Sequence, residues 1–184
     1  MNDPDPLSPV LDALLAEQIE FMLVGSYSSN AYGIPRQTKD ADIVVNPAGK
    51  AIGAIAARLP AGYKLDPQIQ FEGVTGTTRN VISIAGSQFV IELFRLGSDP
   101  HDQERFRRRR VIQFEGRAAT IATAEDVIIM KLRWARRKDL DDIQAVLALQ
   151  QSVLDWDYIY HWCDIHGTRA QLEDLRRELP PNID

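Results

Sequence analysis

A short apolar run that stops at a Gly-Ser pair, followed by a second run that opens on two aspartates, restricts the folds open to this sequence more than any other feature. The run Phe21–Val24 suits a buried strand, and Gly25-Ser26 ends it. Asp40-Ala41-Asp42 precedes the β-branched run Ile43–Val45, which predicts a second strand. Successive side chains of a strand point to opposite faces, so Asp40 and Asp42 share one face.

The residue types at these positions favour binding of a phosphate and a divalent cation. Glycine lets another group approach the backbone closely, and the amides of a helix that starts near Gly25-Ser26 would point toward an anion. Two carboxylates on one face repel each other unless a cation lies between them, and Mg²⁺ takes one or two carboxylates together with substrate phosphate oxygens. Glu92 lies inside the apolar run Phe89–Phe94, where an acid is costly to bury unless it is paired or binds a metal. Three acids beside a phosphate-binding turn predict a two-metal site for phosphoryl or nucleotidyl transfer.

Hydrophobic periodicity divides the chain into a mixed front part and a helical back part. Strands over 81–84 and 89–94 are joined by the turn 85–88, and a second hairpin is predicted over 111–121. Thr123 with Asp126 predicts the start of a helix. The expected order is strands and helices over 1–121 and helices alone over 122–184. Further helices are predicted over residues 7–19, 28–32, 48–59, 140–149, 155–165 and 168–178.

The composition excludes several classes of protein. The 184 residues carry 21 Lys+Arg and 26 Asp+Glu, a formal net charge of −5, which disfavours binding of duplex DNA over a broad face. Cys163 is the only cysteine, so a disulfide or a thiolate zinc site within one chain is excluded. The acidic, proline-broken start does not resemble a signal peptide, and no apolar run is long enough to span a bilayer. We therefore expect a soluble cytoplasmic protein with no membrane partner.

An arginine-rich segment stands out against this acidic background, and two interpretations of it stay open. It is either a solvated face that balances the acidic residues or a surface that grips a polyanion such as a tRNA acceptor stem. Its members are Arg105, Arg107, Arg108, Arg109 and Arg110.

Two blocks of sequence in order resemble a known family. The first is Val24-Gly25-Ser26, a spacer and Asp40-Ala41-Asp42 with a later strand acid, and the second runs from Thr123 to Leu132 and continues over 136–143. Together they resemble the DNA-polymerase-β-like nucleotidyltransferase superfamily over roughly residues 15–150. Within it, the segment 35–42 is similar to the small bacterial branch that includes the abortive-infection toxins of type IV toxin–antitoxin pairs and relatives of the aminoglycoside nucleotidyltransferases. The resemblance implies an α+β fold, with a nucleotidyltransferase-like core sheet flanked by helices over 1–121 and a helical region over 122–184 packed on it.

The resemblance assigns a catalytic and metal-binding role to four residues. Asp40 and Asp42 would bind Mg²⁺, and Glu92 would take the place of the third acid, which helps to bind two metal ions and accepts the proton of the attacking hydroxyl. The usual residue there is Asp, and the extra methylene of Glu92 moves the carboxylate by roughly 1.5 Å. Lys131 would reach the phosphates of the nucleotide.

A second set of residues would hold the nucleotide. Gly25 and Ser26 would bind the triphosphate together with Lys131, and Asp139 would orient Lys131 or an arginine. Arg36 would add positive charge, or it would form a structural ion pair with Asp40.

The resemblance implies a Mg²⁺-dependent enzyme that moves a nucleoside monophosphate from a nucleoside triphosphate to a hydroxyl acceptor. The arginine-rich segment favours tRNA or another RNA as acceptor, while a protein hydroxyl and a small molecule stay open. Such a protein could be the toxin of a toxin–antitoxin pair and bind a cognate antitoxin. The alternative is a catalytically silent member of the same fold that binds a nucleotide or a partner protein.

Each site residue also has a purely structural interpretation. Ser26 could cap a helix, Glu92 could pair with Arg95 or Arg79, and Lys131 could be a surface lysine. Asp141 and Asp142 are expected to be solvated charges on a helix face. The three histidines have no predicted role.

Overall fold

The computed structural model describes residues 5–179, and most of the predicted elements are present in it. The helices are α1 (Ser8–Ala16), α2 (Gly25–Tyr32), α3 (Pro100–Arg108), α4 (Ala124–Trp134), α5 (Arg137–Gln150), α6 (Trp156–His166), α7 (Arg169–Arg177) and the 3₁₀ helix η1 (Ile52–Arg58). The strands are β1 (Glu20–Val24), β2 (Asp40–Asn46), β3 (Tyr63–Leu65), β4 (Gln70–Glu72), β5 (Thr77–Ile84), β6 (Val90–Arg95), β7 (Arg110–Phe114) and β8 (Arg117–Ile121).

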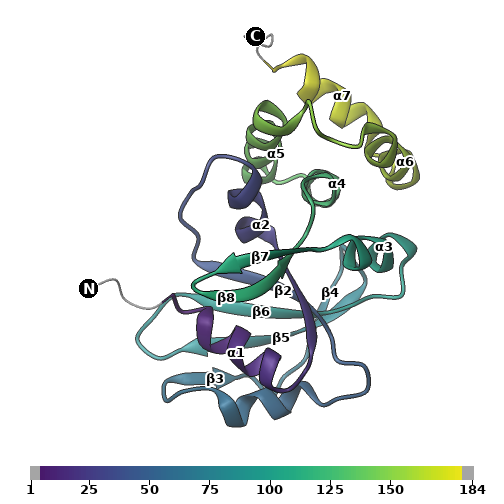
Figure 1. Cartoon of the computed structure of the whole chain (residues 1–184). Helices are drawn as coiled ribbons and strands as arrows, with labels where there is room; N and C mark the ends of the chain where they lie inside the picture. The colour runs from purple at the N-terminus through teal and green to yellow at the C-terminus, as the bar shows by residue number, and fades with distance from the viewer. Residues whose placement is uncertain (1–4, 180–184) are drawn as a thin grey trace.

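All eight strands belong to one mixed sheet, which forms the middle layer of the molecule (Figure 1). The strand order is β3-β5-β6-β2-β1-β8-β7, with β4 paired to β5. β2 lies at the centre, antiparallel to β1 and parallel to β6. The predicted hairpins are both confirmed as antiparallel pairs, β5 with β6 and β7 with β8.

The sheet separates two hydrophobic cores, and successive side chains of β1 point alternately into one core and the other. Phe21 and Leu23 contribute to the core that α1 and η1 cover, whereas Met22 contributes to the core that α4–α7 cover. β2 is divided in the same way, with Val44 on the side of α4–α7. Figure 1 shows these helices on opposite faces of the sheet. The mixed α/β architecture with flanking helices confirms the predicted fold class.

One local prediction needs correction, and another is confirmed. The segment predicted as a helix over 48–59 forms the 3₁₀ helix η1. The cap at Thr123 is confirmed, because its hydroxyl accepts a hydrogen bond from the amide of Asp126. The boundary between 1–121 and 122–184 stays a prediction.

Membrane insertion of a helix has no support over residues 5–179. None of the helices in this range combines the length and the apolar character that crossing a bilayer requires.

Candidate active site

The three predicted acids share one face of the sheet, on the side of α4. Asp42 in β2 is directly opposite Glu92 in the parallel neighbour β6, and Asp40 is two residues earlier on the same face as Asp42. Burial and the negative charges of Asp40 and Glu92 raise the pKa of Asp42 to about 7, although the charge of Lys138 opposes this. Asp42 is therefore only partly ionised near neutral pH.

The turn at Gly25 lies against Asp42. Gly25 has a φ of +61°, and a Cβ atom placed on it would lie 2.2 Å from Oδ2 of Asp42. Only glycine meets both conditions, the left-handed backbone and the close approach. Helix α2 begins at Gly25, earlier than predicted, so its first amides emerge beside this carboxylate.

Ser26 is the second residue of α2 and does not cap it. Val24 occupies the cap position without a side-chain hydrogen bond. The hydroxyl of Ser26 instead accepts a hydrogen bond of 3.1 Å from Nη2 of Arg36.

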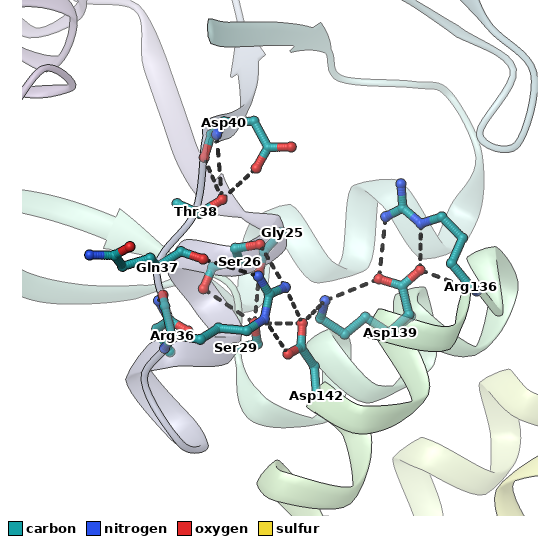
Figure 2. Close-up of polar contacts among 12 residues, drawn as sticks. Gly25, Ser26, Ser29, Arg36, Gln37, Thr38, Asp40, Arg136, Asp139 and Asp142 are labelled. Carbon is teal, nitrogen blue, oxygen red and sulfur yellow. Dashed lines mark hydrogen bonds and ion pairs between the residues drawn. The ribbon is translucent and has the colours of Figure 1, made fainter. Parts of the chain in front are cut away.

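A network of ion pairs joins α2, α4 and α5 next to the carboxylates. Asp142 accepts hydrogen bonds from Arg36, at 2.8 and 2.9 Å, and from Nζ of Lys131, at 2.7 Å. Nζ of Lys131 also donates to Asp139, at 3.3 Å, and Asp139 is paired with Arg136. Figure 2 shows Arg36 turned toward Asp142 and Ser26, and Asp139 beside Arg136. Burial alone would raise the pKa of Asp142, but the hydrogen bonds from Arg36 and Lys131 lower it to about 2.

The network corrects two predictions and bears on two others. Asp142 is buried, not a solvated charge, whereas its neighbour Asp141 is exposed. Arg36 pairs with Asp142 and not with Asp40. Lys131 is buried rather than a surface lysine, and Asp139 contacts both Lys131 and an arginine as predicted.

A pocket lies between the sheet and α4 and contains the predicted site. Its empty space is about 1020 Å³, part of it open to solvent. One face of α4 lines it through Asp126, Val127, Met130, Lys131 and Trp134, spaced as neighbours on a helix. The sheet side includes Gly25, Ser26, Asp40, Asp42, Val44, Glu92 and Phe94. Arg36 does not line the pocket and acts on it only through Asp142 and Ser26.

Comparison with known proteins identifies the fold. Neither the models of protein families nor the curated proteins match the sequence. Among solved structures, ANT(2″)-Ia in complex with adenylyl-2″-tobramycin is similar with a TM-score of 0.60 and 11 % identity, over 89 % of this chain and 96 % of that one. An antigenic nucleotidyltransferase-like protein from Paracoccidioides brasiliensis has a TM-score of 0.58 and 14 % identity, over 96 % of this chain and 92 % of that one.

The chain has a nucleotidyltransferase fold. At identities of 11 and 14 % the likeness establishes the nucleotidyltransferase fold alone. The resemblance to the toxin–antitoxin branch stays a prediction.

Within the nucleotidyltransferase fold, Glu92 has one basic neighbour, Arg79, and one acidic neighbour, Asp42. Its carboxylate is 3.1 Å from Nη1 of Arg79, so the predicted pairing with Arg79 is present and that with Arg95 is not. Arg79 is held in turn by Gln70 of β4. Because Glu92 also lies opposite Asp42, the ion pair with Arg79 and a place among the three acids coexist.

The carboxylates fit a magnesium ion by their chemistry. Among residues 5–179, no three acidic, histidine or cysteine side chains are already grouped as a metal site, and Asp40 hydrogen bonds with Thr38. Mg²⁺ needs only one or two carboxylates from a protein when phosphate oxygens and water complete its ligands. Burial first, and then the negative charges of Asp40 and Glu92, raise the pKa of Asp42, and a cation would neutralise those charges.

The arginine-rich segment does not form one continuous basic face. Four of its five members are ion-paired within the chain, and Arg105 alone among them lines the pocket. Their acidic partners are Asp102, Glu104, Glu125 and Glu20. RNA binding through this segment stays a prediction.

Two groups of polar residues were missed by sequence reasoning. The buried pairing of Asp142 with Arg36 was missed, because Arg36 lies 106 residues away and no local pattern indicates the pair. His101 is fully buried, with Nε2 3.2 Å from Oδ1 of Asp126 and Nδ1 3.1 Å from Nε2 of His166. These histidines join α3, α4 and α6 behind the pocket.

Proposed function

We propose that this protein is a nucleotidyltransferase that moves a nucleoside monophosphate from a nucleoside triphosphate to a hydroxyl acceptor. The observation that carries the proposal is the meeting of Asp42 and Glu92 on adjacent strands beside the Gly25 turn, within a nucleotidyltransferase fold. Carboxylates in such a position serve the binding of metal and phosphate and the removal of a proton.

The phosphates of the nucleotide would lie between the start of α2 and the end of α4. The first amides of α2 have no partner within the helix and attract an anion. Lys131, Arg136 and Lys138 line the same part of the pocket and would offset the phosphate charge. Asp139 and Asp142 hold Lys131 in position, so their role is to orient that ammonium group.

Asp40 and Asp42 would hold magnesium, with Glu92 as a third donor. When bound, Mg²⁺ would neutralise phosphate charge and make the α-phosphorus more electrophilic. Ionised Asp42 is the form that binds a cation, so uptake of magnesium would displace the proton that the raised pKa of Asp42 retains near neutral pH.

The chemical step is an in-line displacement at the α-phosphorus. The acceptor oxygen forms a bond to phosphorus, the bond from phosphorus to the bridging oxygen breaks, and pyrophosphate leaves with that electron pair. Glu92 would accept the proton of the acceptor hydroxyl, and the guanidinium of Arg79, 3.1 Å away, would position the carboxylate. Lys131 would stabilise the charge that develops on the leaving phosphates.

A nucleotide-binding protein without transfer activity is the second candidate. The ion pair between Arg79 and Glu92 favours it, because this pair engages the carboxylate that would accept the proton. Either form could belong to a toxin–antitoxin pair, and purification of the protein with the product of a neighbouring gene would support that setting.

Labelling and calorimetry separate the candidates. The protein is incubated with each α-labelled triphosphate, Mg²⁺ and separate pools of cellular RNA, protein and small molecules. Transfer of label to one pool with release of pyrophosphate supports the enzyme. Binding of a triphosphate by calorimetry without any transfer supports the silent form, and absence of both contradicts the two together.

A further inference from the structure

We propose that the end of the pocket at α3 binds an anionic group of the acceptor, a phosphate or a carboxylate, through Arg105. The inference rests on the proposed function, because it concerns the second substrate of the same site. It implies that the acceptor is a hydroxyl compound that also carries negative charge.

Arg105 is a buried cation whose hydrogen-bonding capacity is largely unused. It is 6 % exposed and lines the pocket, and its Nε donates to Oδ1 of Asp102 at 2.9 Å. Its two terminal nitrogens have no hydrogen-bond partner among residues 5–179. A guanidinium has five N–H donors, and the unpartnered terminal nitrogens of Arg105 are not fully buried, so they are accessible from the pocket that Arg105 lines. An oxyanion that accepts from both terminal nitrogens would satisfy them in the geometry that arginine prefers.

The charges that a ligand meets at this end are mainly positive. Arg105 and Arg79 both line the pocket, and the Arg79 side chain, which is paired with Glu92, is 28 % exposed. The acids nearby are sealed, because the side chains of Asp102 and Asp126 are 2 % and 0 % exposed. Asp126 is also hydrogen-bonded by Thr123, Tyr158 and His101. At Arg105 itself a ligand therefore meets a guanidinium group, while the carboxylates of Asp102 and Asp126 are covered.

The Arg105 end of the pocket is distinct from the end assigned to the triphosphate. The start of α4 is next to α3, since Asp126 contacts His101, and Lys131 further along α4 contacts Asp139 of α5. The five residues from Asp126 to Lys131 span about 7.5 Å of helix.

Apolar side chains lie between the two ends. Val44 and Phe94 form the sheet side next after Asp42 and Glu92, with Val127 and Met130 opposite on α4. An acceptor can thus place its hydroxyl near Glu92, its uncharged part over Phe94 and its anionic group at Arg105. A polycationic acceptor would be repelled by the same arginines.

Calorimetry with matched ligand pairs tests the proposal on the whole chain. Each ligand is titrated with and without Mg²⁺ and a non-hydrolysable triphosphate. The pairs differ by one phosphate: adenosine 5′-monophosphate against adenosine, which represents an RNA end, and glucose 6-phosphate against glucose, which represents a small molecule. An aminoglycoside serves as the cationic ligand. We expect the phosphate-bearing member of at least one pair to bind at least about tenfold more tightly, as a charge-assisted bidentate contact allows.

Variants assign the preference to Arg105. Arg105→Gln should abolish the preference and leave triphosphate affinity unchanged, while Arg177→Gln, on the exposed end of α7, should alter neither. If Arg105→Gln does not fold because Asp102 loses its partner, Arg105→Lys keeps a positive charge beside Asp102 but lacks the two terminal nitrogens of the guanidinium, and it should lower the preference severalfold.

Three results would overturn the proposal: no preference for the charged member of either pair, tighter binding of the aminoglycoside, or an equal loss of triphosphate affinity in Arg105→Gln. Failure of the proposed function gives a different result. In that case the triphosphate does not bind, but the ligand pairs still show whether Arg105 binds the anionic group.

Discussion

Gly25 has no side chain, so the backbone at the start of α2 can lie against the carboxylate of Asp42. The positive φ and the 2.2 Å approach of a Cβ atom to Oδ2 act together at this position. Gly86, in the turn between β5 and β6, also has a positive φ of +75° but open space around it. Substitutions at the two glycines therefore distinguish the cost of backbone strain from the cost of steric contact with the site.

We expect Gly25→Ala to destabilise the protein by about 2–4 kcal/mol and Gly86→Ala by only about 1–2 kcal/mol, since the second substitution brings backbone strain without overlap. Urea unfolding monitored by circular dichroism measures both. In an Asp42→Ala background the cost of Gly25→Ala should fall toward that of Gly86→Ala. Equal costs of the two glycine substitutions in the unmodified protein would show that Asp42 does not press on the turn.

The pKa of Asp42 predicts how stability depends on pH. Because its pKa is raised to about 7 in the folded protein, the protonated form favours folding, and this contribution is lost as pH rises from about 4 through 7. Asp42→Asn removes the penalty of charging, so it should stabilise the metal-free protein at pH 8 more than at pH 5, by on the order of 2 kcal/mol. Chemical unfolding at the two pH values measures the difference. A gain that is the same at both would mean that Asp42 ionises normally.

Among the elements, α4 and α5 are joined to α2 by the charged network around Asp142. Its members come from three helices and the segment after α2, so the network fixes how the helices that carry Lys131 sit over the sheet. Removing the charge of Asp142 leaves Arg36 and Lys131 without their shared partner, which is costly because Lys131 is buried.

Asp142→Asn should destabilise the protein by about 2–4 kcal/mol at pH 7, and the exposed neighbour Asp141→Asn by less than about 0.5 kcal/mol. The pKa of Asp142 is lowered to about 2, so its contribution is present above pH 4 and is lost as pH falls toward 2. Unfolding of both variants at pH 7 and pH 2.5 tests this dependence. Similar stability of the two variants at pH 7 would count against a structural role for the network.

For the molecule as a whole, the sheet and the helical part share a core. Met22 of β1 and Val44 of β2 pack with residues of α4–α7, so the predicted boundary near residue 121 crosses a common hydrophobic cluster. All three tryptophans, Trp134, Trp156 and Trp162, belong to the helical part, so their fluorescence reports on it separately from the strands.

Unfolding should therefore be a single transition, with the same midpoint by tryptophan fluorescence and by the circular dichroism of the sheet. Met22→Ala should lower both midpoints together, with a loss of about 2–4 kcal/mol for a fully buried side chain. Two separate midpoints would show that 122–184 unfolds independently.

Sequence patterns predict the parts of this fold that depend on local order. The strands β1 and β2 follow from their apolar runs, and the shared face of Asp40 and Asp42 follows from strand periodicity. The three-residue strands β3 and β4 were missed because they are too short for a period to appear. The partner of Asp142 was missed because Arg36 lies 106 residues away, and only the tertiary fold brings the two together.

The central claim is that Asp42 takes part in nucleotidyl transfer. A comparison of label transfer by Asp42→Asn and by Asp141→Asn tests it most directly. Both variants replace one carboxylate by an amide, but only Asp42 lies in the pocket. With Mg²⁺, α-labelled triphosphate and the acceptor pool that the unmodified protein labels, we expect Asp141→Asn to retain full transfer and Asp42→Asn to lose it while keeping its fold by circular dichroism. Undiminished transfer by Asp42→Asn would contradict the assignment of this carboxylate to the reaction.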